Sequence, residues 1–184
     1  MSPRRAFLRV LPVLAAPALL CAPARAQPLG LARESAVKAA YLYKFASFVE
    51  WPQGTFRNPS EAFVIGVYGD DSVASELEQL ARGRTIEGRS VTVLRLREPD
   101  TANQLHLLFA GGPRESRIRE VLNAARGPVL TIADGPVGGQ PGPVLHFSEE
   151  EGRVRFNASL TAAAARNLKL SAKLLAVAQQ VEGR

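Results

Sequence analysis

Histidine, cysteine and an activated serine are the residues that most often carry catalysis or metal binding. The two histidines of this chain, His106 and His146, lie in apolar segments that predict β-strands. Its one cysteine, Cys21, lies near the N-terminus. A catalytic zinc site usually takes three protein ligands, which these residues do not supply. We find no serine-hydrolase or phosphate-loop motif, and we expect a protein without catalysis, metal or cofactor.

Three turns follow predicted parallel strands, at residues 69–72, 111–113 and 134–136. The carboxyl ends of parallel strands lie at one edge of the sheet, where ligands of α/β proteins usually bind. Asp70, Gly111 and Asp134 are the residues that would face such a ligand. Because every strand–helix unit needs a turn, a plain connection is the favoured interpretation of each.

Trp51 is the only tryptophan, and it follows Phe45 and Phe48. Such an aromatic group is more typical of a core than of a ligand site. The acidic run Glu149–Glu151 before Gly152 is most simply a solvated hairpin turn, and a partner contact there is the minority interpretation.

The first 26 residues are typical of a cleaved export signal. Arg4, Arg5 and Arg9 form a basic start, residues 7–21 form a short apolar segment, and residues 24–26 end in a small-residue cleavage site. The pair Arg4-Arg5 also matches a twin-arginine signal, so the sequence leaves Sec and twin-arginine export open. Either route predicts a periplasmic protein.

Charge does not point to nucleic acid once the signal is removed. Residues 27–184 hold 19 basic and 17 acidic residues, a net charge of about +2. A nearly balanced surface lacks the basic footprint of a nucleic-acid-binding protein.

The elements that must position these residues alternate between strands and helices. Residues 34–50 predict a helix with an apolar stripe, and further helices are expected after residue 72 and at 115–125, 160–166 and 171–181. Strands are expected at 63–68, 91–96, 105–110 and 129–133, and those at 63–68 and 129–133 are expected to be buried. Asn167 is expected in the left-handed conformation between the last two helices. The expected stripe residues of the first helix are Val37, Ala40, Tyr41, Phe45, Phe48 and Val49.

This alternation predicts an α/β fold with one domain over residues 27–184. We expect a mostly parallel sheet flanked by helices on both faces. Residues 144–147 and 154–156 predict a β-hairpin at the sheet edge near the C-terminus.

The segment Ala36–Pro52 resembles the opening signature of the YfiR family, A-x-x-Y-x-F-x-x-F-x-x-W-P. The residues that carry the resemblance are Ala39 or Ala40, Tyr41 or Tyr43, Phe45, Phe48, Glu50, Trp51 and Pro52. The resemblance continues in order through residues 63–69, 88–96, 106–109, 130–136, 152–157 with Leu160, and 164–175. It therefore covers nearly all of the chain after the signal.

The resemblance implies a periplasmic, non-enzymatic α/β protein that restrains an inner-membrane diguanylate cyclase by binding its periplasmic sensor domain. An outer-membrane, OmpA-like lipoprotein would sequester the repressor and release the cyclase, which raises cyclic di-GMP and favours biofilm. A homodimer is also expected. The alternative function is a periplasmic sensor module that binds a small ligand at the three turns.

We expect the partner-binding surface to combine the first helix with the hairpin. The expected contact residues are Tyr41, Lys44, Glu50, Trp51, Phe147, Glu149, Glu150 and Arg155. The hairpin is included because sheet edges invite added strands.

One departure from the family concerns cysteine. Members commonly carry cysteines before the strand of His106 and around the loop of Asp134, whereas here Leu105 holds the first position and residues 134–143 contain no cysteine. Redox control by a disulfide is therefore not implied for this chain.

Overall fold

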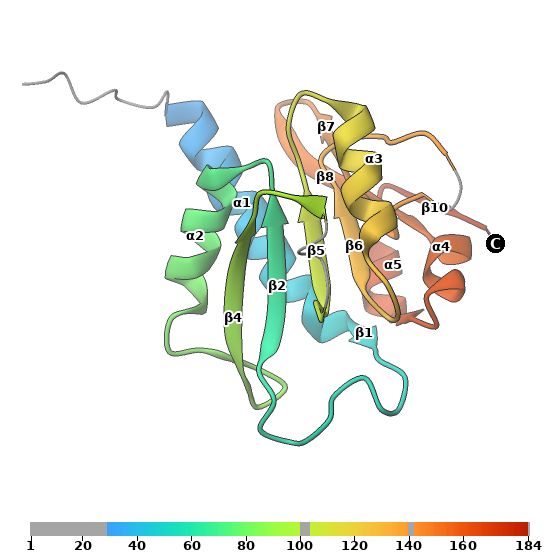
Figure 1. Cartoon of the computed structure of the whole chain (residues 1–184). Helices are drawn as coiled ribbons and strands as arrows, with labels where there is room; N and C mark the ends of the chain where they lie inside the picture. Colours follow the sequence, from blue (N-terminus) through green and yellow to red (C-terminus); the bar gives the residue numbers. More distant parts are fainter. Residues whose placement is uncertain (1–28, 100–103, 140–141, 184) are drawn as a thin grey trace, which may run out of the picture.

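The computed structural model describes residues 29–99, 104–139 and 142–183 (Figure 1). The predicted export signal lies outside the described residues. The helices are α1 Leu29–Phe45, the 3-10 helix η1 Ala46–Phe48, α2 Asp71–Ala81, α3 Glu115–Ala124, α4 Leu160–Ala165 and α5 Ala172–Val177. The strands are β1 Val49–Glu50, β2 Phe63–Tyr68, β3 Thr85–Ile86, β4 Arg89–Leu96, β5 Leu107–Ala110, β6 Leu130–Ala133, β7 Leu145–Glu150, β8 Arg153–Ser159, β9 Lys169–Leu170 and β10 Gln180–Glu182.

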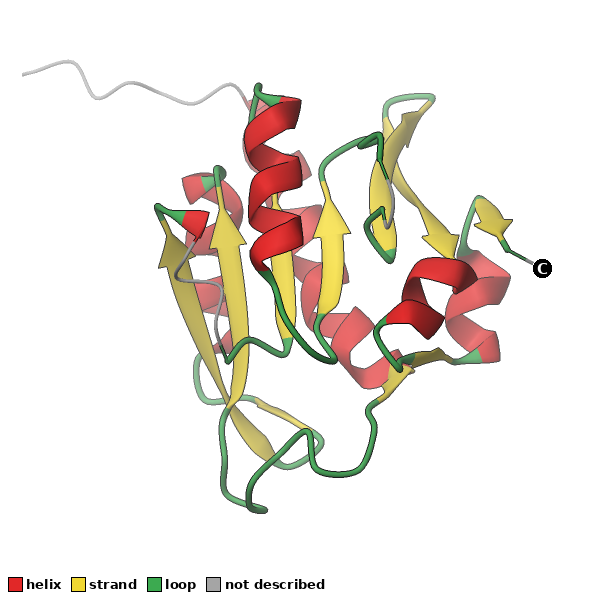
Figure 2. Ribbon diagram, turned by 45° about the vertical axis from the view of Figure 1, so that its right-hand side comes forward, coloured by secondary structure: helices red, strands yellow, loops and turns green. Residues whose placement is uncertain are grey.

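Eight of the described strands form one sheet in the order β10-β8-β7-β6-β5-β2-β4-β3 (Figure 2). The five neighbouring strands β4, β2, β5, β6 and β7 run parallel to one another. β8 returns antiparallel to β7, and β10 then adds in parallel to β8. β3 pairs antiparallel with β4 at the other edge, and β1 and β9 form a separate two-stranded ribbon. The predicted mostly parallel α/β sheet is confirmed.

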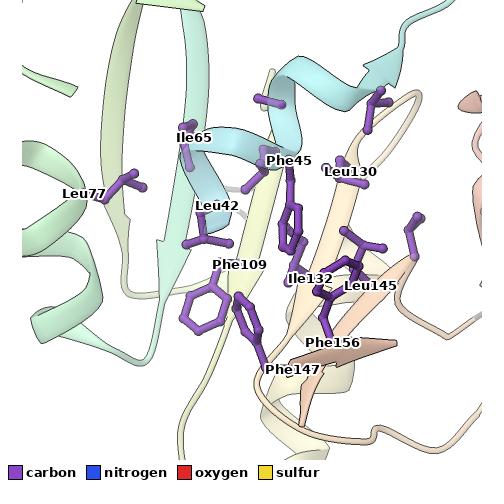
Figure 3. Close-up of a cluster of buried hydrophobic side chains, with 14 of the residues drawn as sticks. Leu42, Phe45, Ile65, Leu77, Phe109, Leu130, Ile132, Leu145, Phe147 and Phe156 are labelled. Atoms are coloured by element: carbon purple, nitrogen blue, oxygen red, sulfur yellow. The ribbon is translucent and has the colours of Figure 1, made fainter. Parts of the chain in front are cut away.

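Helices cover both faces of this sheet, as predicted. On one face, side chains of α1, α2, α4 and α5 share a core with residues such as Leu107 and Phe109 of β5 (Figure 3). On the other face, α3 packs its apolar side against Leu108 and Ala110. Successive side chains of a strand point to opposite faces of the sheet. Because helices cover both faces here, β5 and β6 are buried at every position.

The first helix differs from its prediction in length and phase. It ends at Phe45, and residues 46–50 continue as η1 and β1 rather than as helix. The buried face holds Ala39, Leu42 and Phe45, whereas Val37 is exposed. The predicted stripe was set partly by Phe48 and Val49, which lie beyond the helix, so its phase was wrong.

The C-terminal region also differs from prediction. The predicted helix 171–181 ends at Val177, and β10 follows it. The hairpin is confirmed as β7–β8, and its turn residues Glu151 and Gly152 have φ values of 50° and 71°, typical of a two-residue turn. β10 pairs with residues 157–159 of β8, which leaves Arg153–Arg155 as the part of the hairpin at the edge. Asn167 has the predicted left-handed conformation, with φ 56°.

Candidate functional site

A groove of about 1210 Å³ lies between α1, the loop after β6 and the β7–β8 hairpin. We call it the α1–hairpin groove. It is lined by Gly30, Arg33, Glu34, Val37, Lys38, Tyr41, Asp134, Gly135, Pro136, Phe147, Ser148, Glu149, Glu151, Gly152, Arg153, Val154 and Arg155. It therefore brings together five residues singled out in the sequence, which are Tyr41, Asp134, Phe147, Glu149 and Arg155.

An aromatic cluster forms the floor of the groove. Phe147 is 2% exposed, and its ring centroid lies 6.0 Å from that of Tyr41 and 6.0 Å from that of Phe45. Phe156 of β8 closes the cluster, 4.8 Å from Phe45 (Figure 3). Because Tyr41 is half-buried while Phe147 is covered, a bound partner would touch Tyr41 directly and Phe147 mainly through it.

Lys38 joins α1 to the loop after β6 at one wall of the groove. Its Nζ lies 2.7 Å from Asp134 Oδ1 and 2.6 Å from Glu34 Oε1. Burial on its own lowers the pKa of Lys38, but the hydrogen bonds and charges of Asp134 and Glu34 outweigh burial and raise the pKa above its ordinary value. A lysine held between two carboxylates stays charged and fixes how α1 sits on the sheet.

We predict that Lys38→Met lowers the free energy of unfolding by about 1–3 kcal/mol, because it leaves two carboxylates facing each other without their cation. The value lies below that of a fully buried pair because Asp134 and Glu34 are partly solvated. Urea denaturation followed by circular dichroism measures the loss. Lys44→Met is the matched control, since Lys44 is exposed on the same helix and should change stability little. Equal losses in both variants would contradict the role given to Lys38.

Charged residues of both signs form the rim of the groove. Arg33, Arg153 and Glu149 are exposed, and Arg155 Nε lies 3.6 Å from Glu150 Oε2 across the hairpin. An apolar floor with a charged rim suits binding of a protein surface or of an amphipathic molecule. In the described part of the chain, no three His, Cys, Asp or Glu side chains lie close enough to hold a metal ion.

The remaining residues of the predicted partner surface lie elsewhere. Glu50 and Trp51 line a separate hollow of about 440 Å³, where Trp51 packs edge-on against Phe63 at 5.5 Å between centroids. Lys44 is exposed on α1 and lines neither hollow. The structure thus brings the hairpin residues and Tyr41 together, whereas Glu50 and Trp51 lie beyond the C-terminal end of α1.

The two other turn residues proposed for a ligand have structural partners. The carboxylate of Asp70 caps α2 by accepting hydrogen bonds from the backbone N–H groups of Ser72 and Val73, at 3.0 and 2.9 Å. Gly111 packs against Gly69 of the neighbouring turn. Of Asp70, Gly111 and Asp134, it is Asp134 that lines the α1–hairpin groove.

The sequence did not point to several charged residues of the groove, among them Lys38, Arg33 and Arg153. One signal for Lys38 was present, because Glu34 precedes it by four residues and such pairs meet on a helix surface. No local pattern marks Arg33 or Arg153, because their shared rim depends on β7 lying beside β6.

His106 is a structural residue of the sheet. Its Nδ1 accepts a hydrogen bond from the backbone N–H of Val64 at 3.0 Å, and its ring stacks on Phe56 with centroids 4.4 Å apart. Burial lowers the pKa of His106 below its ordinary value of 6.5, and the charge of Glu61 offsets this only in part. A proton on Nδ1 would remove the acceptor of the Val64 hydrogen bond.

This geometry predicts that acid weakens the fold through His106. Because the pKa of His106 is lowered in the folded protein, the unfolded chain binds a proton more readily than the folded chain does. The free energy of unfolding is therefore unaffected by His106 above pH 6.5 and falls as the pH drops below 6.5. In His106→Asn, the amide oxygen replaces the acceptor without titrating. Urea midpoints at about pH 7.5 and about pH 5.5 should therefore differ less in the variant than in the wild type. An equal difference in both proteins would contradict the prediction. His146, whose pKa burial also lowers, remains in both proteins.

Comparison with known proteins decides the family. A family model described as YfiR/HmsC-like matches residues 35–179, which is most of the chain. The chain belongs to the YfiR/HmsC-like family. Members of this family are periplasmic, regulatory and non-catalytic, and they act in cyclic di-GMP signalling at the level of a diguanylate cyclase. The matched range contains both walls of the α1–hairpin groove except Gly30, Arg33 and Glu34.

A crystal structure of a conserved domain protein from Vibrio cholerae O1 biovar El Tor is similar, with a TM-score of 0.43 and 13% sequence identity. The alignment covers 66% of this YfiR/HmsC-like chain and 55% of that chain. No curated protein matches the sequence. None of the helices in the described residues has the length and apolar character needed to span a membrane.

Proposed function

We propose that this protein is a non-enzymatic periplasmic repressor of an inner-membrane GGDEF diguanylate cyclase. It binds the periplasmic domain of the cyclase and favours an inactive arrangement of that enzyme, so cyclic di-GMP and biofilm formation fall. The observation that carries the proposal is the family match over residues 35–179. The export signal expected in residues 1–26 supports the periplasmic location.

The α1–hairpin groove is the surface we propose for this contact. It offers a half-buried aromatic side chain, Tyr41, within a rim that includes exposed Arg153 and Glu149. Interfaces commonly combine a central aromatic or arginine anchor with a polar rim. Among the described strands, none pairs with the outer edge of Arg153–Arg155, so its backbone groups can bind a partner strand.

Release of the cyclase would follow from competition for the repressor. An OmpA-like lipoprotein of the outer membrane that binds the same protein would lower its free concentration in the periplasm. By mass action, the cyclase would then be freed without any change in its own affinity.

The first experiment captures the tagged protein from the periplasm and identifies the membrane proteins that accompany it. Recovery of a GGDEF-domain protein, together with raised cyclic di-GMP after deletion of the gene, is the expected result. A deletion strain with unchanged cyclic di-GMP and no captured cyclase would contradict the proposal.

A second candidate function is a periplasmic sensor that binds a small molecule. The size of the α1–hairpin groove favours it, because about 1210 Å³ is room enough for a molecule that fills a common ligand site of about 300–1,000 Å³. Native mass spectrometry of protein purified from the periplasm should then show a retained small molecule. A single peak at the mass of the bare polypeptide, unchanged after incubation with periplasmic extract, would contradict this function.

A further inference from the structure

The outer edge of β4 lacks a partner strand over most of its length. β2 pairs with β4 along one side from Val91 to Leu96. On the other side, β3 pairs only with Arg89 and Ser90. Among the described strands, none pairs with the outer edge of residues 91–96. The backbone N–H and C=O groups that point outward there can therefore bind another strand.

A hollow of about 540 Å³ lies along this edge, between β4 and the C-terminal end of α2. It is open because residues 82–84 turn back toward α2, where the backbone N–H of Arg84 donates to the carbonyl oxygen of Ala81 at 3.0 Å. The half-buried side chains of Val91 and Val93 line the hollow. The hollow is thus the space beside β4 that a longer β3 would fill.

Two arginines give this hollow a positive charge. Arg82 and Arg84 line it, both are exposed, and neither belongs to an ion pair among the described residues. Glu78 also lines the hollow, but its carboxylate accepts hydrogen bonds of 2.9 Å from Nε and Nη2 of Arg95. These hydrogen bonds are the main cause of the lowered pKa of Glu78, to which the charge of Arg82 contributes least. Because Arg95 already neutralises Glu78, the charges of Arg82 and Arg84 remain available to an acidic partner.

β3 indicates the direction in which an added strand would run. It lies antiparallel to β4 on this edge. A strand placed antiparallel beside residues 92–96 would continue the line of β3, with its C-terminal end toward Arg84. Its side chains would alternate between the hollow, beside Val93, and the other face of the sheet, where Leu94 is 40% exposed. The edge also lacks the proline and lysine with which proteins commonly keep such strands apart.

We propose that the outer edge of β4 binds an extended segment of a different protein, antiparallel to β4 and acidic at its C-terminal end. Residues 92–96 supply the main-chain hydrogen bonds, which give affinity to any strand. Arg82 and Arg84 select the acidic segments, because guanidinium and carboxylate groups form charge-assisted hydrogen bonds. The edge lies across the sheet from the β7–β8 hairpin, so this surface differs from the α1–hairpin groove and does not depend on the proposed function.

The first test uses a designed peptide as the probe. It has the sequence Thr-Val-Thr-Val-Thr-Glu-Glu, a fluorophore at its N-terminus and an amidated C-terminus, so that its only carboxylates are those of the side chains. One control peptide ends in Gln-Gln, and another keeps Glu-Glu but is methylated at every backbone amide of the Thr-Val run, which prevents strand pairing. Fluorescence anisotropy measures the binding of each peptide to the protein purified from the periplasm. The acidic peptide should bind about tenfold more tightly than either control.

Two results of this test overturn the proposal. The first is equal affinity of the acidic peptide and either control, because charge or strand pairing would then play no part in binding. The second is absence of binding by the acidic peptide, which includes the case that a second copy of this chain covers the edge.

The second test changes the two arginines. Arg82→Gln combined with Arg84→Gln should weaken binding of the acidic peptide about tenfold and leave binding of the Gln-Gln peptide unchanged. Arg153→Glu is the matched control, since it changes the net charge by the same amount at the rim of the α1–hairpin groove. It should bind the acidic peptide as the wild type does, whatever its affinity for a cyclase. Unchanged binding by the arginine double variant, or equal losses in both proteins, overturns the proposed surface.

Discussion

Phe147→Ala is expected to lower the free energy of unfolding by about 3–5 kcal/mol. The Phe147 ring is 2% exposed and packs against Tyr41, Phe45 and Phe109, each with centroids 6.0 Å away. Removing it leaves a cavity beneath the α1–hairpin groove, lined by rings that cannot collapse freely. Urea denaturation at a protein concentration that holds the oligomeric state constant measures the loss.

Two controls separate this cavity from a general effect of the hairpin. Phe147→Leu keeps much of the buried volume and should cost clearly less than the alanine variant. Val177→Ala removes an exposed apolar side chain and should change stability by less than about 0.5 kcal/mol. A Phe147→Ala protein as stable as Val177→Ala would show that the hairpin does not pack on α1 as described.

Gly69→Ala is expected to be the second severe substitution, with a cost of about 2–5 kcal/mol. Gly69 has φ +76°, in the region that favours glycine. A Cβ atom placed there would lie 2.1 Å from the carbonyl oxygen of Gly111. The oxygen belongs to the backbone of the neighbouring turn, and a Cβ is fixed to the backbone at Gly69, so relief requires the carboxyl ends of β2 and β5 to separate.

Gly83→Ala is the matched control for this prediction. Gly83 has a similar φ of +69°, but a Cβ there meets no atom within 4 Å. It should cost only the conformational penalty, about 1–2 kcal/mol. Thermal or urea unfolding of both variants makes the comparison, and equal losses would contradict the close approach of Gly69 to Gly111.

The parallel strands β2, β4, β5 and β6 and the helix α3 could be predicted because their signals are local. β2, β4, β5 and β6 each read as short apolar runs, and Ile118, Val121 and Leu122 mark one face of α3 at helical spacing. β3, β9 and β10 could not be predicted, since strands of two or three residues show no period. Their conformation depends on pairing with segments far away in the sequence.

The candidate site could be predicted only in part, for the same reason. Tyr41 and the hairpin residues were chosen from separate segments, and the order β6-β7-β8 is what brings them to one groove. That order is a property of the whole sheet. Glu50 and Trp51 were grouped with Tyr41 because one long helix was expected, and the helix ends at Phe45 instead. The partner cannot be read from either the groove or the sequence pattern, and it enters through the family alone.

The most direct test of the proposed function measures the affinity of the protein for the periplasmic domain of the captured cyclase. Isothermal titration calorimetry compares the wild type, Arg153→Glu at the rim of the groove and the control Arg114→Glu. Arg114 is exposed beside α3, on the opposite face of the sheet. Repression through the α1–hairpin groove predicts tight binding by the wild type and by Arg114→Glu, and binding about tenfold weaker or worse by Arg153→Glu. Absence of wild-type binding would contradict repression by direct contact, and equal affinity of all three proteins would contradict the groove as its surface.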